Sequence, residues 1–176
     1  MKILVKGYSG SGKSTFARVL GDYYQIPVLH LDAVHFKENW QEIADELFEK
    51  KVQDFMVKND SWIIDGNYSR IATNRNTEAD IVFFFDFNRF FCLKSVLKRY
   101  RQNKGKTRFS MASGCEEKID KEFINWVLFK GRSKSVKKRY KDLLSNCKKA
   151  IVFKNRKQVH RYYKFNNIPF DEKNIK

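Results

Sequence analysis

The chain has 176 residues, a mass of 21.0 kDa and a formal net charge of +16. This length supports one domain with a single core and excludes a large multidomain protein. Hydrophobic residues make up 42% of the chain and there are only 2 prolines, a composition typical of a folded globular protein rather than a disordered one. The large positive charge implies phosphate-rich partners, either nucleotides or nucleic acid.

The sequence contains no apolar run near the roughly 20 residues that a membrane-spanning helix needs. Because its N-terminus also enters a strand-like segment directly, we expect a cytoplasmic protein without a membrane partner. The three cysteines, Cys92, Cys115 and Cys147, are odd in number and lack the spacing of metal ligands, so we expect reduced thiols. The sequence leaves the oligomeric state open.

Strand-like and helix-like patterns alternate along the chain. Short β-branched or apolar runs predict five strands, at 2–7, 28–32, 62–65, 79–87 and 148–153. Apolar positions three and four residues apart predict helices at 13–24, 40–55, 93–102, 119–127, 136–144 and 156–165. This alternation favours a three-layer α/β fold with a five-stranded parallel sheet. We expect one domain over 1–176, with a helical region at 36–60 and a flap at 103–118.

The first strand leads directly into "GYSGSGKS", which matches GxxxxGK[ST] from Gly7 to Ser14. Such glycines let the backbone turn successive N–H groups inward, and a helix starting near Lys13 adds its positive dipole end, so the loop should bind phosphates. Lys13 would reach the β- and γ-phosphates and Ser14 would ligate Mg²⁺, which predicts ATP and Mg²⁺ as cofactors. The predicted cofactor-binding residues of this loop are Gly7, Ser9, Gly10, Ser11, Gly12, Lys13, Ser14 and Thr15.

Two aspartates, Asp32 and Asp65, end predicted strands at the same sheet edge as the phosphate loop. Ligands of parallel sheets bind outside these carboxyl ends, so the two carboxylates should meet in one crevice. We predict that Asp32 acts as general base and that Asp65 binds the metal, while a helix cap or turn is the alternative for each. His30 and His35 flank Asp32 as ordinary hydrogen-bonded residues or as acceptor contacts.

Phosphoryl transfer needs cations that stabilise charge on the transferred group. Basic residues lie on both sides of the predicted flap, and we choose Arg99, Arg108 and Arg132 as catalytic lid cations. The alternative for each is a solvated basic surface.

Several stretches resemble known proteins. The phosphate loop, "HLD" and "IIDGNYSR" are similar to P-loop small-molecule kinases of the adenylate and shikimate kinase type. "WIIDGNYSR", "LKRYRQNKGKTR" and "MASGCEEKID" resemble bacterial DNA topology modulation proteins, the FlaR-related family. The resemblance covers nearly the whole chain and implies strand order 2-3-1-4-5, ATP with magnesium, and an acceptor site opposite the phosphate loop. The family name also implies a role in DNA topology.

The resemblance also implies roles for single residues. Asp65 and Gly66 followed by Arg70 are similar to the "DG" and arginine that hold the acceptor in adenylate kinases, with the arginine here one position later. Asp32 matches the acidic residue near magnesium and the acceptor hydroxyl in shikimate-type kinases. Asn155 and Arg156 match the loop that packs on the donor base. Ser95 replaces one of the two arginines that often follow the fourth strand, with Lys94 or Lys98 as substitutes.

A different class of function also fits the charge. No acidic residue occurs from Leu143 to Phe170, while this stretch carries Lys148, Lys149, Lys154, Arg156, Lys157, Arg161 and Lys164. It could bind nucleic acid without sequence specificity, with Tyr162, Tyr163 and Phe165 as stacking residues or as the inner face of a helix. We favour an ATP-dependent kinase whose acceptor is a nucleoside, nucleotide or similar metabolite. A nucleic-acid-binding protein and a nucleotide-dependent switch are the alternatives.

Overall fold

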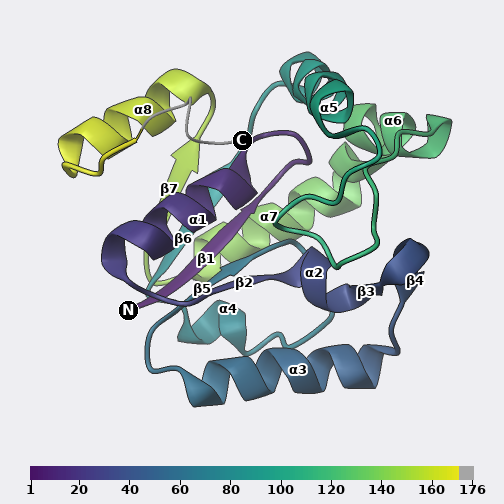
Figure 1. Cartoon of the computed structure of the whole chain (residues 1–176). Coiled ribbons are helices and arrows are strands. Elements are labelled where there is room, and N and C mark those ends of the chain that lie inside the picture. Colours follow the sequence, from purple (N-terminus) through teal and green to yellow (C-terminus); the bar gives the residue numbers. More distant parts are fainter. Residues whose placement is uncertain (171–176) are drawn as a thin grey trace.

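The computed structural model describes residues 1–170, which form a parallel five-stranded sheet covered by helices on both faces (Figure 1). The strands follow the order β2-β5-β1-β6-β7, which is 2-3-1-4-5 when they are counted along the chain. The expected α/β fold is therefore confirmed. The strands are β1 (Lys2–Gly7), β2 (Val28–His30), β5 (Trp62–Asp65), β6 (Ile81–Phe85) and β7 (Ala150–Phe153).

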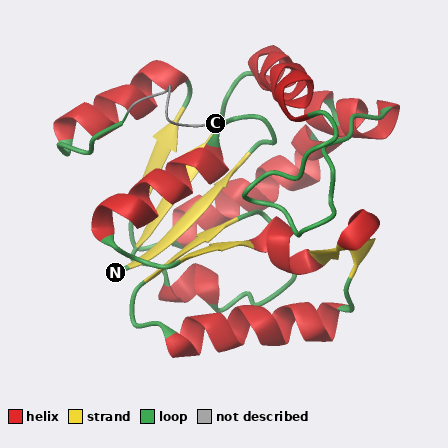
Figure 2. Cartoon of the chain, in the orientation of Figure 1, coloured by secondary structure: helices red, strands yellow, loops and turns green. Residues whose placement is uncertain are grey.

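Helices cover both faces of the sheet because the inner strands are apolar on both sides. In β1, Ile3 and Val5 pack in one cluster with α1 (Lys13–Tyr24) and α8 (Arg156–Phe165), whereas Leu4 belongs to a second cluster. Figure 2 shows the resulting arrangement of helices around the strands. The remaining helices of the layers are α3 (Asp45–Lys58), α4 (Arg75–Glu78) and α7 (Lys134–Asn146).

The carboxyl ends of the strands are covered by α5 (Arg89–Asn103), α6 (Lys121–Leu128) and the flap between them. Helix α5 starts earlier than the predicted residue 93, because the Asn88 side chain caps it by accepting a hydrogen bond from the Phe90 N–H. The flap, 103–118, is irregular apart from isolated bridges at Lys104↔Glu117 and Thr107↔Glu116.

The second predicted strand is too long. It ends at His30, and Leu31–His35 forms the short helix α2. Asp32 therefore lies in the first turn of a helix and not at a strand end. In that first turn a carboxylate interacts favourably with the helix dipole.

The helix predicted at 40–55 begins later, at Asp45. Before it, β3 (Phe36–Lys37) and β4 (Gln41–Glu42) form an antiparallel hairpin that includes the turn Glu38–Trp40. Asn39 and Trp40 have φ values of 57° and 61°, which no right-handed helix can contain. The region 36–60 is thus a hairpin followed by a helix.

Within residues 1–170, no helix combines the length and the apolar character that crossing a membrane requires.

Candidate active site

The phosphate loop depends on glycines for two different reasons. Gly7, Gly10 and Gly12 have φ values of 142°, 80° and 93°. A Cβ at Gly7 would lie 2.6 Å from the Phe85 Cβ, and one at Gly10 would lie 2.4 Å from the Cys92 carbonyl oxygen. A Cβ at Gly12 would have no neighbour within 4 Å. Gly7 and Gly10 therefore allow close packing beneath the loop, whereas Gly12 faces open space.

Helix α1 begins at Lys13, and its first turn contains no acidic residue. The N–H groups at a helix start lack carbonyl partners within the helix, and the dipole favours anions there. Ser11 closes the loop from inside, since its buried hydroxyl donates to the Tyr8 carbonyl at 2.6 Å. Ser9, Gly12, Lys13, Ser14 and Thr15 line a cavity of about 1630 Å³. The loop thus has the geometry of an anion site.

Asp65 ends β5 beside the phosphate loop and is only 4% exposed. Its Oδ2 lies 2.9 Å from Nδ1 of His30. Although burial acts to raise the pKa of Asp65, the hydrogen bond with His30, the charge of Lys13 and the Ser14 hydroxyl lower it below its usual value. Asp65 is therefore an ionised carboxylate close to Lys13 and Ser14.

The residues around Asp65 fit a magnesium ion. Its Oδ1 is buried and has no hydrogen-bond partner among the described residues, so one carboxylate oxygen is available beside the Ser14 hydroxyl. No group of three or more His, Cys, Asp or Glu side chains suited to a metal occurs within residues 1–170. Mg²⁺ bound with a nucleotide does not need such a group, because phosphates and water supply most of its ligands.

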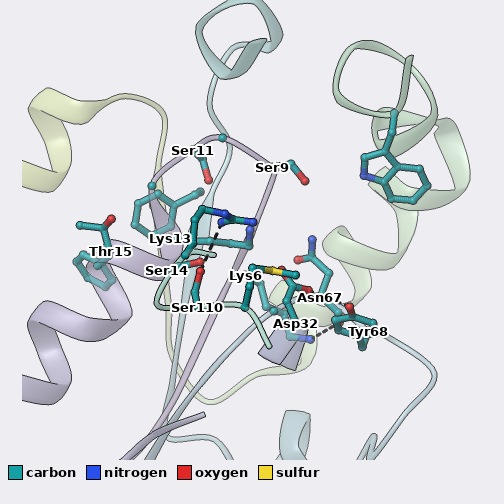
Figure 3. Close-up of a pocket in the computed structure, with 18 of the residues that line it drawn as sticks. Lys6, Ser9, Ser11, Lys13, Ser14, Thr15, Asp32, Asn67, Tyr68 and Ser110 are labelled. Carbon is teal, nitrogen blue, oxygen red and sulfur yellow. Dashed lines mark hydrogen bonds between the residues drawn. The ribbon is translucent and has the colours of Figure 1, made fainter. Parts of the chain in front are cut away.

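Asp32 lines the same cavity, next to Tyr68 and Asn67 (Figure 3). The Tyr68 hydroxyl donates a hydrogen bond of 2.8 Å to its Oδ1. Burial, followed by the nearby charge of Asp32, raises the pKa of Tyr68, which keeps the phenol protonated and able to donate. Asp32 is thus held in one orientation at the cavity wall.

The loop after β5 was not expected to connect the two sides, yet it does. The Asn67 side chain accepts from the Gly7 N–H at 3.2 Å and donates to the Gly7 carbonyl at 3.0 Å. Tyr68, the next residue, contacts Asp32. The loop therefore links the phosphate loop to the candidate base, and the only sequence signal for this role is its place after the "DG" motif.

Two buried cations hold this loop in shape. The fully buried Arg75 guanidinium donates to backbone carbonyls between residues 67 and 72. Lys6, which is 2% exposed, donates from Nζ to the Asn67 carbonyl at 3.1 Å. Burial and then the charge of Arg75 lower the pKa of Lys6 well below its usual value. Both side chains are structural supports of the loop.

Two of the predicted lid cations meet at a buried acid. Glu117, 5% exposed, forms ion pairs with Arg99, at 2.8 Å, and with Arg108. Burial, followed by the charge of Arg108, lowers the pKa of Arg99, while Glu117 acts in the opposite direction. The three residues line the cavity and fasten the flap to α5. The sequence did not single out Glu117 as a site residue, although it lies in the stretch "MASGCEEKID".

The flap is also fastened to the β3–β4 hairpin. The Asn39 N–H donates to the Gly114 carbonyl at 3.2 Å, and the Trp40 indole N–H donates to the Glu116 carbonyl at 2.9 Å. The Cys115 thiol donates to the Lys37 carbonyl at 3.0 Å. Together, flap and hairpin cover one end of the cavity.

The third predicted lid cation, Arg132, lies elsewhere. Its guanidinium stacks 3.6 Å from the centroid of the Tyr8 ring and donates to the Val127 carbonyl at 3.1 Å. It contacts the phosphate loop from outside the cavity lining.

The other predicted site residues either line the cavity or support the elements around it. Gly66, Arg70 and Arg156 line the cavity, with Arg70 exposed. Gly66 has φ 140°, and a Cβ there would approach the Leu31 Cβ to 2.8 Å, so it permits α2 to pack closely. The Asn155 side chain caps α8 by accepting from the Gln158 N–H, and does not line the cavity.

The basic C-terminal stretch lies mostly on α8. Tyr163 is buried and stacks on Phe16 with ring centroids 5.5 Å apart, so it belongs to the inner face of the helix. Phe165 is 86% exposed. The cations exposed in this region are Lys154, Arg156, Lys157, Arg161 and Lys164.

No family model and no curated protein match the sequence. Solved structures match it in fold. The shikimate kinase of Bacteroides thetaiotaomicron is 14% identical with a TM-score of 0.50, covering 95% of this chain and 98% of that chain. A deoxyadenosine kinase from M. mycoides is 15% identical with a TM-score of 0.54, covering 95% of this chain and 99% of that chain.

The chain shares its α/β fold, a five-stranded parallel sheet flanked by helices, with these two kinases. At these identities the likeness concerns the fold alone, and the FlaR-related family is not shown by any of these comparisons. The activity has to be argued from the site.

Proposed function

We propose that this protein is a small-molecule kinase that transfers the γ-phosphoryl group of ATP to a hydroxyl group of a small acceptor. The observation that carries the proposal is one cavity that is lined by both the phosphate loop and Asp32. A phosphate donor and an acceptor can therefore be held face to face, as phosphoryl transfer requires.

The donor side supplies binding and charge. The loop N–H groups and the start of α1 hold the phosphates, and Lys13 contacts the β- and γ-phosphates. Ser14 and Asp65 would hold Mg²⁺, which when bound neutralises charge on the phosphates. The buried, ionised state of Asp65 supports this role, because a carboxylate with a lowered pKa stays charged at neutral pH.

The acceptor side supplies orientation and a base. Asp32, held by Tyr68, accepts the proton of the attacking hydroxyl. The flap over the cavity limits water, which would otherwise compete as acceptor. Arg99 of α5 and Arg108 of the flap line the same cavity and could stabilise charge on the transferred group.

The test is ADP release with Mg²⁺ and ATP, measured with nucleosides, nucleoside monophosphates, sugars and small hydroxy acids as acceptors. We expect one class to raise the rate and Lys13→Ala to reduce it by about a hundredfold or more while the circular dichroism spectrum is unchanged. Lys157→Ala, which removes an exposed lysine of α8, is the matched control and should keep the rate. Acceptor-dependent ADP release that persists in Lys13→Ala would refute the proposal.

A second candidate is non-specific nucleic-acid binding, which the exposed cations of α8 favour. The role in DNA topology that the FlaR-related resemblance implies would require such a surface. This candidate predicts duplex binding that weakens steeply with salt and survives Lys13→Ala. Absence of any acceptor effect together with such binding would favour this candidate or a nucleotide-dependent switch.

A further inference from the structure

A series of aromatic rings forms one wall of the acceptor side. It runs from the buried Phe48 through Tyr68, His35 and Phe36 to Trp40. Successive ring centroids are 5.0, 4.8, 4.8 and 5.4 Å apart, and the rings meet edge to face or tilted. All but Phe48 line the cavity. These four lining rings, Tyr68, His35, Phe36 and Trp40, are called the aromatic wall below.

The aromatic wall connects the candidate base to the flap. At its inner end the Tyr68 hydroxyl holds Asp32, and at its outer end the Trp40 indole N–H donates to the Glu116 carbonyl. The Trp40 side chain is therefore fixed by its polar edge, and its ring faces, one of which lies under the Lys118 ammonium, are the surfaces that a ligand ring could contact. A ligand lying along the wall would have one end at Asp32 and the other under the flap.

The backbone at the outer end is strained. Asn39 and Trp40 both have positive φ in the hairpin turn, and tryptophan is a bulky residue for this conformation. Strain of this kind persists at sites where it positions a functional side chain, and here it places the indole at the cavity.

The cations near the wall are mostly neutralised. Arg99 and Arg108 share the buried Glu117, and the two buried cations Lys6 and Arg75 are occupied by backbone carbonyls. Arg70 and Lys118 are exposed at the cavity and form no ion pair among the described residues. Lys118 lies at the outer end of the wall, with its Nζ 5.1 Å from the centroid of the Trp40 ring.

We propose that the acceptor is a hydroxyl compound with a planar heteroaromatic ring, the chemistry of a nucleoside, and that Phe36 and Trp40 select it by ring stacking. This inference rests on the proposed kinase function and narrows its acceptor class. The ring packs against the aromatic wall and the hydroxyl reaches Asp32. The hydroxyl oxygen forms a bond to the γ-phosphorus, the bond between that phosphorus and the bridging oxygen breaks, the proton passes to Asp32, and ADP leaves.

Equilibrium binding without ATP separates this inference from catalysis. Isothermal titration calorimetry of the whole chain would use adenosine, guanosine, cytidine and thymidine, with adenosine monophosphate, ribose and shikimate as comparison compounds. We expect at least one nucleoside to bind and Trp40→Leu to weaken it by about tenfold, as for loss of one ring–base stack. Trp40→Phe, which keeps a ring, should have an affinity between those of the unaltered chain and Trp40→Leu. Phe36→Leu should also weaken binding.

Phe165→Leu is the matched control, because it removes an exposed ring on α8 outside the cavity lining. Failure of all four nucleosides to bind, equal binding by Trp40→Leu, or binding of ribose or shikimate in preference to nucleosides would overturn the ring assignment. A nucleoside that binds through Trp40 but receives no phosphate from ATP would instead contradict the proposed function.

Discussion

The two sides of the cavity are constructed differently. The donor side consists largely of eight consecutive residues, Gly7 to Ser14, between one strand and one helix. The acceptor side gathers Asp32 from α2, Trp40 from the hairpin, Tyr68 from the loop after β5 and Glu117 from the flap. Backbone N–H groups and glycine conformations define the first side, whereas side-chain contacts between distant segments define the second.

This difference affects how mutations should act. A change in the phosphate loop should impair ligand binding more than stability wherever it faces the open cavity. A change on the acceptor side should impair stability or flap closure, because its residues hold separate segments together. Three substitutions test this contrast.

The largest effect should come from Glu117→Gln on the acceptor side. It leaves Arg99 and Arg108 close together without their shared anion, and breaking such a buried group costs about 3 kcal/mol or more. Urea unfolding should report this loss, and hydrogen exchange of 103–118 should become faster. ATP binding, which depends on the other side, should be unchanged.

The matched control is Glu116→Gln, which changes the exposed neighbour and leaves its backbone carbonyl in place for Trp40. Equal stability of the Glu117 and Glu116 variants would show that the buried acid does not hold the flap.

Gly12→Ala should weaken ATP binding by about a hundredfold on the donor side, because the added methyl group enters the open space above the loop. With φ at 93° it should lower stability by only about 1 kcal/mol. Calorimetric titration with ATP and Mg²⁺, together with thermal unfolding, would measure both quantities.

Gly105→Ala is a close control for conformation, since Gly105 also has a positive φ, 69°, and no neighbour within 4 Å of an added Cβ. It should share the small loss of stability and retain ATP binding. If both variants bind ATP equally, the open space at Gly12 is not the phosphate site.

The smallest effect concerns how the stability that Asp65 provides depends on pH. Its lowered pKa means that the folded state favours the ionised carboxylate, so the stability it provides is present above about pH 4 and is lost as the pH falls through its folded pKa. Asp65→Asn should cost about 2 kcal/mol at pH 7 through the weakened contact with His30. In urea unfolding at several pH values, the difference from the unaltered chain should shrink below pH 4.

Asp60→Asn, at an exposed position, should show little difference at any of these pH values. A stability difference for Asp65→Asn that stays constant down to pH 2 would show that its ionisation is not linked to folding.

The predictions from sequence succeeded where a pattern is local. The start of α1 at Lys13 agrees with expectation, because apolar periodicity and a glycine motif act over a few residues. The strand order also agrees, but it was expected from the resemblance to P-loop kinases and not from a local pattern. The helix expected from residue 40 begins only at Asp45. The prediction was too early because Ile43 and Ala44 fit helical spacing, whereas the positive φ of Trp40, which places it in a turn, leaves no trace in the apolar periodicity. Asp32 lies on helix α2 rather than at a strand end. Leu31 of this helix is buried and packs beside Gly66, a tertiary contact that the local sequence pattern does not indicate.

The sequence by itself determined a P-loop, a parallel α/β sheet and a strongly basic chain, because these follow from consecutive residues and from composition. Only the tertiary structure decided which charges remain available. Arg99 and Arg108 are close together in sequence but are tied to Glu117 by folding of the flap, and Arg132 stacks on Tyr8 instead of lining the cavity. The aromatic wall likewise arises from two stretches, 35–40 and the loop that carries Tyr68, which meet only in the folded chain.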